Sequence, residues 1–229
     1  MRMITIILWT CFATASASAE PRNVLFIAVD DLRPELGCYG RPVHSPNIDQ
    51  LAREGILFER AYVQCALCMP SRVSILTGRR PDTTGVVDFS VRFRDVMGDV
   101  VTLPQHFKNN GFYTARVSKI FHMGVPGGIE AGTDGADDPR CWTERFNSQG
   151  PEWKAPGLGW TLEGNPDGKL PVKGGNTFVV VEADGDDLVH SDGRTAAKAC
   201  ELIAAHKDEP FFLGVGFVRP HVPFVAPKK

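Results

Sequence analysis

The sequence predicts an α/β fold in which a mostly parallel sheet is flanked by helices on both faces. Apolar runs rich in branched residues, such as residues 23–29 and 211–218, are typical of strands buried on both faces. These runs alternate with segments that begin on helix-start signals, the pattern of strand–helix units. Two of the strands end in polar residues, Asp30-Asp31 and His221, and parallel sheets bind ligands beyond the carboxyl ends of their strands. We therefore expect a functional site at that edge.

Strand and helix signals alternate in the first half of the chain. Residues 23–29 form an unbroken apolar run, and residues 56–62 form a second run that predicts the next strand. Helices are predicted where a cap residue or a first-turn proline precedes a periodic segment. One helix starts at Ser45-Pro46 and ends at Gly55, one starts near Pro70, and one starts at Thr102-Leu103-Pro104 and ends at Gly111.

The same alternation resumes in the second half. Further strands are predicted at residues 112–117, 178–183 and 211–218. Ser191-Asp192 predicts the cap of a helix, and its apolar face is formed by Ala196, Ala199, Cys200 and Ile203.

A long segment, residues 123–175, is dense in Gly, Pro, Asp and Trp and has no sustained periodicity. It predicts a functional surface loop anchored by Trp142, Trp153 and Trp160, and the alternative is a flexible insert.

The composition is that of an ordinary globular chain of 229 residues, 43% hydrophobic and 23% charged. We expect one domain, or most of one, over residues 20–229. The net charge of -2 argues against a broad nucleic-acid-binding surface.

Residues 1–19 have the pattern of a secretory signal. Arg2 gives a basic start, residues 4–13 form an apolar run too short to span a bilayer, and Ala17-Ser18-Ala19 is a small-x-small cleavage site before Glu20. The alternative is an uncleaved anchor or a buried N-terminal strand. The interpretation predicts a secreted or periplasmic protein that is free of the membrane after cleavage.

Five cysteines remain once Cys11 leaves with the signal. An oxidising compartment would permit disulfides among Cys38, Cys65, Cys141 and Cys200, in three possible complete pairings. The alternative is that all four are free and buried.

Two clusters of residues could carry chemistry. Cys68 precedes Pro70, near a predicted helix start whose free amide donors favour negative charge, and Arg72 adds a planar cationic fork that suits an oxyanion. The alternative is a buried structural cysteine. Asp30 and Asp31 offer hard oxygen ligands for Ca²⁺ or Mg²⁺, although two acidic residues at a strand end are often only a turn or a cap.

Three motifs together give a resemblance to a known family. Residues 68–79 read C-x-P-S-R-x-x-x-L-T-G-R, which resembles the signature of the type I sulfatases. Residues 111–122 resemble the second signature of that family, G-Y-x-T-x-x-x-G-K-x-x-H, with Phe112 for the usual aromatic residue and Ser118 for the usual glycine. Residues 219–224 resemble a third element of the family. The serine puts the local turn geometry in doubt, because glycine tolerates backbone angles that serine resists.

The resemblance implies an alkaline-phosphatase-like sulfatase fold and a modified, metal-dependent site. In the family the cysteine that matches Cys68 is oxidised to formylglycine by a formylglycine-generating enzyme. Asp30 and Asp31 match metal-binding aspartates, which the oxygen at position 68 joins. We expect Ca²⁺ as the cofactor, with Mg²⁺ as the alternative.

The resemblance also implies the chemistry. A hydroxyl of hydrated formylglycine at position 68 attacks the sulfur of a sulfate ester, and the second hydroxyl later expels the sulfate. Lys119 and Arg72 match residues that neutralise charge, and His122 or His221 assists proton transfer to the leaving alcohol.

Residues 30–40, 77–84 and 219–224 resemble the iduronate-2-sulfatase-like branch of the family. This similarity implies a sulfated sugar or uronic acid of a glycan as substrate, and a lysosomal location if the source is eukaryotic. Family members are about twice this length, so we expect a truncated catalytic domain that lacks its C-terminal part. Two alternatives remain open: a non-catalytic fragment that binds glycans or is inactive, and a phosphonate or phosphate monoester hydrolase of the same superfamily.

Overall fold

The computed structural model describes residues 22–152, 154–161 and 179–228. The predicted signal segment lies outside these residues, as do Trp153 and residues 162–178 of the predicted loop. In the described part of the chain, no helix is both long and apolar enough to cross a membrane.

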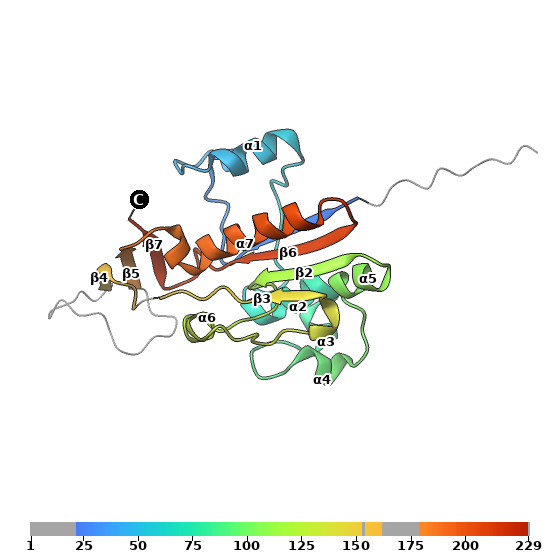
Figure 1. The fold of residues 1–229 in the computed structure, drawn as a ribbon. Coiled ribbons are helices and arrows are strands. Elements are labelled where there is room, and N and C mark those ends of the chain that lie inside the picture. Colours follow the sequence, from blue (N-terminus) through green and yellow to red (C-terminus); the bar gives the residue numbers. More distant parts are fainter. Residues whose placement is uncertain (1–21, 153, 162–178, 229) are drawn as a thin grey trace, which may run out of the picture.

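A four-stranded sheet lies at the centre of the molecule, and its strands are all parallel (Figure 1). Its strand order is β1-β6-β2-β3. The strands are β1 (Val24–Val29), β6 (Phe211–Phe217), β2 (Tyr113–Ser118) and β3 (Glu144–Phe146). The register pairs Val29 with Phe217 and Ser118 with Gly216, so the three longest strands end at the same edge. The predicted α/β class and the mostly parallel sheet are therefore confirmed.

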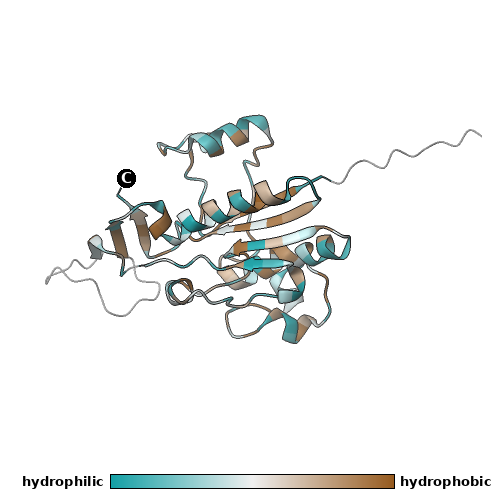
Figure 2. Ribbon diagram, in the orientation of Figure 1, coloured by the Kyte–Doolittle hydropathy of each residue, from teal (hydrophilic) through white to brown (hydrophobic). Residues whose placement is uncertain are grey.

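Helices pack on both faces of this sheet. Helix α7 (Ser191–His206) lies over β6 and β2 on one face, while α2 (Cys68–Thr77) and α5 (Leu103–Asn109) lie on the other (Figure 1). Each interface is an apolar cluster, and β6, which contributes to both, is largely hydrophobic (Figure 2). Thr102 caps α5 as predicted, because its hydroxyl accepts a hydrogen bond from the amide of Gln105.

Shorter elements complete the described chain. A second sheet has the order β4-β5-β7, formed by Gly157–Thr161, Val179–Ala183 and Phe224–Pro227. The other α-helices are α1 (Pro46–Glu54), α3 (Pro81–Thr84), α4 (Phe93–Met97) and α6 (Gly127–Ala131). Three 3-10 turns occupy Gly37–Tyr39, Pro139–Cys141 and Asp187–Val189.

The predicted strand at residues 56–62 is wrong. These residues form a loop between α1 and α2, and Ile56 and Tyr62 are 81% and 82% exposed. A strand needs a neighbour that takes its backbone hydrogen bonds, and the described residues contain no strand beside this run. An apolar run alone therefore predicts the wrong structure here.

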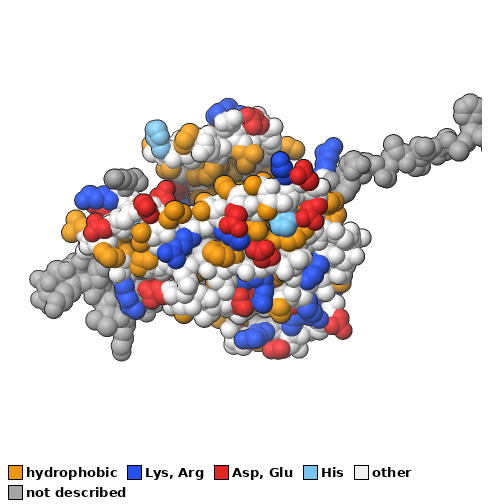
Figure 3. Space-filling view, in the orientation of Figure 1, with side chains coloured by type: hydrophobic (Ala, Val, Ile, Leu, Met, Phe, Trp, Pro, Cys, Tyr) orange, Lys and Arg blue, Asp and Glu red, His pale blue; other side chains and the backbone are white. Residues whose placement is uncertain are grey.

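Strand β1 is buried on one face only, whereas the sequence predicts burial on both. Leu25 and Ile27 are 46% and 49% exposed, while Phe26 and Ala28 pack against the α2 side of the core. The reason is that α7 covers β6 and β2, and α1 stands away from the sheet (Figure 1). Apolar side chains surround the resulting hollow beneath α1 (Figure 3).

The buried face of α7 is displaced from the predicted one. Ser191, Thr195, Ala199 and Leu202 are buried, whereas Ala196 and Cys200 are exposed. The N-cap residue is His190 rather than Ser191. Thr195 can point inward because its hydroxyl donates to Ser148 Oγ at 2.7 Å, so a polar residue occupies a position that hydrophobicity alone assigns to solvent.

The predicted long loop contains α6, β3 and β4 within its described residues. Trp142 is 4% exposed and anchors it, as predicted, but Trp160 lies on β4 and is 44% exposed. All five described cysteines are free, so the disulfide alternative is not realised.

Candidate active site

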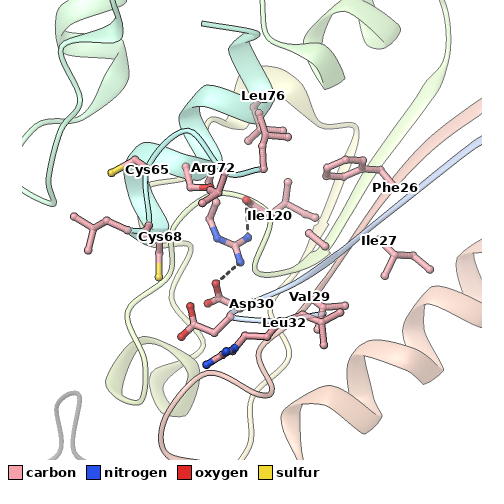
Figure 4. A pocket seen from close by; sticks show the side chains of 18 residues that line it. Phe26, Ile27, Val29, Asp30, Leu32, Cys65, Cys68, Arg72, Leu76 and Ile120 are labelled. Atoms are coloured by element: carbon pink, nitrogen blue, oxygen red, sulfur yellow. Dashed lines mark hydrogen bonds and ion pairs between the residues drawn. The ribbon is translucent and has the colours of Figure 1, made fainter. Parts of the chain in front are cut away.

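Cys68 is the first residue of α2, two positions before the predicted start near Pro70. The amide of Ser71 bonds to the Leu67 carbonyl, so the first turn already includes position 68. The helix ends at Gly78, whose φ of 67° is the left-handed conformation common at helix ends. The Cys68 side chain projects from this first turn toward the end of β1 (Figure 4).

The site forms where β1, α2 and the segment after β6 meet. Ligand atoms of Asp30, Cys68 and His221 all lie within 4.8 Å of one another. His221 Nε2 lies 4.0 Å from Asp31 Oδ2. The parallel register produces this arrangement, because it ends β1 and β6 side by side. Residues that are 191 positions apart in sequence, Asp30 and His221, thus become neighbours.

Arg72 is 7% exposed and binds groups of the chain itself. One guanidinium nitrogen lies 3.0 Å from Asp30 Oδ1 (Figure 4). Another donates to the carbonyls of Lys119 and Ile120, the second at 2.9 Å. The cationic fork predicted to face an oxyanion therefore ties β1 to the turn after β2.

Lys119 sits in a tight turn that follows β2. The amide of Ile120 bonds to the Ser118 carbonyl at 3.0 Å, and the φ of Ser118 is 59°. Arg116 supports this turn by donating to the Ser118 carbonyl at 2.8 Å. Strand β6 supplies Gly216 beneath the turn, where an added Cβ would lie 2.1 Å from the Lys119 carbonyl oxygen. The turn thus aims the Lys119 ammonium at Asp30, with which it forms an ion pair.

Burial and opposite charges set the ionisation of this cluster. Burial disfavours the carboxylate of Asp30, but the positive charges of Arg72 and Lys119 outweigh it and lower the pKa of Asp30. Burial lowers the pKa of Lys119, and Asp30 opposes that shift. Burial and the negative charge of Asp30 raise the pKa of the Cys68 thiol. An unmodified thiol at this position is therefore held in its weakly nucleophilic, neutral form.

His122 faces the same space from the other side. Burial, followed by the positive charges of Lys119 and Arg72, lowers its pKa to about 4. Its ring packs against Phe89, with 4.7 Å between the ring centres. His122 is thus a neutral imidazole at physiological pH. It can donate one hydrogen bond and accept another, but it carries no charge.

Two cavities meet at Cys68. The first, of about 1080 Å³, also exposes Asp31, His122 and His221, and its rim carries Phe89, Phe224 and Arg33. The second, of about 630 Å³, lies between β1 and α2 and is walled mainly by apolar side chains (Figure 4). The first cavity has the size of a small-molecule binding site and holds more of the polar side chains.

The donor groups fit one side of a cation site. Asp30 supplies a carboxylate oxygen, the donor that Ca²⁺ and Mg²⁺ prefer, close to the side chains of residue 68 and His221, and Asp31 offers a second carboxylate 4.0 Å from His221. Two carboxylates are fewer donors than the six to eight oxygens that Ca²⁺ takes. Any such cation would also compete with the Lys119 ammonium for the Asp30 carboxylate.

All seven candidate site residues therefore lie either around Asp30 or along the wall of the first cavity, and Cys68 and His221 belong to both groups. They are Asp30, Asp31, Cys68, Arg72, Lys119, His122 and His221. Sequence reasoning missed three residues that shape the site, namely Phe89, Arg116 and Gly216. A glycine inside a predicted buried strand is a signal for close backbone approach, and it could have revealed Gly216.

Comparisons with known proteins find relatives of this chain. The sulfatase family model matches residues 22–229. Human iduronate 2-sulfatase is 43% identical over 219 residues, which cover 94% of this chain and 38% of the relative. A sulfatase of Formosa agariphila is 32% identical over 215 residues, which cover 90% of this chain and 40% of the relative. The chain thus spans about two fifths of the length of these relatives.

Solved structures show the same architecture. A protein solved with its substrate D-glucosamine-2-N,6-O-disulfate superposes with a TM-score of 0.59 at 24% identity, covering 89% of this chain and 35% of that chain. The phosphonate monoester hydrolase of Agrobacterium radiobacter superposes with a TM-score of 0.59 at 23% identity, covering 91% and 43%. At these identities the likeness shows the fold alone.

Proposed function

Because this chain belongs to the sulfatase family, in its iduronate-2-sulfatase-like branch, we propose that it acts in the hydrolysis of sulfate monoesters on sulfated sugars. The alkaline-phosphatase-like fold expected from the resemblance is confirmed. The observation that supports the proposed activity is the cluster of Asp30, Cys68 and His221, with Lys119 paired to Asp30, beside an open cavity that Cys68 and His221 line. The substrate class, a sulfated uronic acid or related sugar of a glycan, follows from the similarity to iduronate 2-sulfatase.

We propose that Cys68 acts after conversion to formylglycine by a formylglycine-generating enzyme. The raised pKa of the Cys68 thiol supports this, because a neutral thiol is a poor nucleophile. Conversion replaces the thiol by an aldehyde, whose hydrate offers two hydroxyl oxygens at the same place. One hydroxyl oxygen gives up its proton and forms a bond to sulfur while the sulfur–oxygen bond to the sugar breaks. The second hydroxyl then gives up its proton, so that the aldehyde re-forms and the carbon–oxygen bond to the sulfate breaks.

Other side chains handle charge and protons in this proposal. Lys119 offsets negative charge near the sulfate oxygens, while Arg72 holds Asp30 and the Lys119 turn in place. The leaving alcohol takes a proton, and His122 and His221 are the imidazoles that face the cavity. Asp30 and Asp31 would hold Ca²⁺ or Mg²⁺, which would supply Lewis-acid stabilisation of the reacting oxygens.

The proposal also extends to location. We propose that the protein is secreted or periplasmic, or lysosomal in a eukaryotic source, because residues 1–19 have the pattern of a secretory signal.

The test combines mass spectrometry with activity assays on the purified chain. The peptide that contains residues 68–72 is first weighed to establish conversion of Cys68. Turnover is then measured with 4-nitrophenyl sulfate, a 2-O-sulfated uronic acid disaccharide and 4-nitrophenyl phosphate, each with Ca²⁺ or with Mg²⁺. We expect sulfate release in the converted protein and none in Cys68→Ala, while Cys200→Ala, an exposed cysteine on α7, retains the parent rate.

Each other result has a defined meaning. Turnover of the phosphate ester alone would assign the chain to the phosphate branch of the superfamily. Absence of turnover after confirmed conversion would contradict catalysis by this chain, and binding of a sulfated glycan would then indicate a non-catalytic role. Turnover by protein with an intact thiol would contradict the formylglycine mechanism.

A further inference from the structure

The segment that carries His221 has no regular secondary structure, yet it is tied down on both sides. Residues 218–223 join β6 to β7 and lie at the edge of the sheet where the candidate site forms. Two acidic residues from distant parts of the sequence, Asp192 and Glu152, hold this segment. The proposed mechanism uses neither of them.

The Asp192 carboxylate binds the backbone at the start of the segment. Its two carboxylate oxygens accept hydrogen bonds from the amides of Val218 and Arg219, each at 2.8 Å. Burial raises the pKa of Asp192, and the two amide hydrogen bonds oppose that rise. Asp192 lies in the first turn of α7, which packs on β6. Its carboxylate therefore fixes the start of the segment relative to this helix.

The Arg219 side chain links the segment to β7. Its guanidinium donates to the His221 carbonyl at 3.0 Å and to the Val225 carbonyl, on β7, at 3.2 Å. The remaining nitrogen forms an ion pair with Glu152, which is 1% exposed. The second oxygen of Glu152 accepts a hydrogen bond from Ser191 at 3.3 Å, so the ion pair is itself anchored to α7.

These contacts leave the His221 ring in one orientation. The His221 amide bonds to the Val218 carbonyl at 2.9 Å, and the ring Nδ1 lies 2.6 Å from the Val222 carbonyl. Since a carbonyl only accepts, Nδ1 carries the proton of this bond. Nε2 then faces Asp31 and the cavity.

We propose that Asp192, Glu152 and Arg219 are positioning residues that fix the orientation of His221 in the candidate site. Asp192 binds two backbone amides before the histidine, and Arg219, held by Glu152, binds the backbone carbonyls of His221 and Val225. Removing one of these groups frees the segment while leaving the His221 side chain itself intact. The consequence for catalysis rests on the proposed function, but the orientation of the ring does not.

The ring orientation can be read directly by NMR of the full, ¹⁵N-labelled chain at pH 7.5. Two-bond ¹H–¹⁵N correlations of imidazole report which nitrogen carries the proton, and loss of one set of signals in His221→Gln assigns that residue. In the parent we expect a single set of His221 signals with the proton on Nδ1. In Asp192→Asn and Arg219→Lys we expect a mixture of tautomers, because the Val222 contact is no longer held.

Matched controls come from the same region. Asp186→Asn removes a carboxylate that accepts the Leu188 amide, and Arg194→Lys changes an arginine that donates to the Leu188 carbonyl. Both should leave the His221 signals unchanged. If a positioning variant fails to fold in a thermal melt, Glu152→Gln, which keeps a neutral oxygen for Arg219, takes its place.

Parent-like His221 signals in the folded positioning variants would overturn the proposal. If the parent turns over sulfate, we also expect about a 10-fold lower kcat in Asp192→Asn with KM within about 3-fold, and an unchanged kcat would overturn the catalytic consequence. If the parent shows no turnover, the proposed function fails, and the NMR result still decides whether these residues orient His221.

Discussion

Ser118 adopts a backbone conformation that suits glycine. Its φ of 59° lies in the left-handed region, and its hydroxyl is buried without a hydrogen-bond partner among the described residues. The sequence raised doubt about this turn because serine stands where the family has glycine. The structure answers that doubt, since the turn forms with serine and is held by Arg116 from one side and by Gly216 beneath it. Strain of this kind costs about 1 to 3 kcal/mol and is often found at functional sites.

We therefore expect Ser118→Gly to stabilise the protein. Relief of strain and removal of a buried unpaired hydroxyl should outweigh the greater flexibility of glycine in the unfolded chain, for a net gain of about 1 kcal/mol. Urea unfolding measures the change. Ser148→Gly is the control, because Ser148 has no positive φ and accepts a hydrogen bond from Thr195, so its loss should destabilise. A destabilised Ser118→Gly would contradict the strain argument.

His122 should make stability depend on pH. Its pKa is about 4 in the folded protein and about 6.5 when unfolded, so between these values only the unfolded chain takes up the proton. The stability it contributes is fully present above pH 6.5 and is lost as the pH falls toward 4. After allowance for solvent screening of the half-buried ring, we expect a loss of about 1 kcal/mol between pH 7 and pH 5.

The measurement is urea unfolding in EDTA at both pH values. His122→Gln should show a pH-dependent loss that is smaller by that amount. An equal loss in parent and variant would show that other groups cause the dependence.

The sequence predicts which residues belong to the candidate site, but it does not predict which groups each of them contacts. Cys68, Lys119 and His122 were found because they recur at fixed spacing in short motifs. The partners of Arg72 were not found, because its hydrogen bonds reach residues 47 and 48 positions away. Such contacts depend on how elements pack and leave no local pattern.

At the scale of elements, the close approach of β6 to the Lys119 turn decides where Lys119 lies. We expect Gly216→Ala to destabilise the protein by about 3 kcal/mol and to displace the turn, because the added carbon would lie 2.1 Å from a backbone oxygen. Gly214→Ala is the matched control on the same strand. Its added carbon would meet the Ile120 side chain at 3.1 Å, which can shift, so its cost should be much smaller. Equal unfolding midpoints in urea would contradict this account.

Elements were predictable where local pattern and packing agree. Strands β2 and β6 and helices α1 and α5 match the predictions to within one or two residues. Residues 56–62 did not match, because an apolar run becomes a strand only beside another strand. The face of α7 was also misjudged, since alanine occurs readily on either face of a helix and Thr195 is buried through its hydrogen bonds.

At the scale of the whole molecule, the hollow between β1 and α1 exposes apolar surface to water. Leu25 and Ile27 on β1, together with Phe58 and Val63 on the loop before α2, are each at least 46% exposed. Strand β1 also lies at the edge of its sheet, where backbone groups are open to another strand. Surfaces of this kind promote association between copies of a chain.

We therefore expect the 229-residue chain to self-associate, and Leu25→Thr combined with Ile27→Thr to shift it toward monomer. Sedimentation velocity over a range of concentrations measures the shift. Val96→Thr on α4 is the control, because it removes a similar apolar group that is 52% exposed but lies away from the hollow. A parent that stays monomeric at high concentration would contradict the expectation.

The strand order has a further consequence for how the protein is made. Strand β6 lies between β1 and β2, and the Phe211 amide at its start bonds to Asn23, 188 residues earlier in the chain. During synthesis, β1 and β2 therefore leave the ribosome before the strand that joins them exists. At about 5 to 20 residues per second, β1 waits on the order of 10 to 40 s for β6. The ion pair between Asp30 and Lys119 therefore reaches its place between the ends of β1 and β2 only after that delay, when β6 joins the two strands.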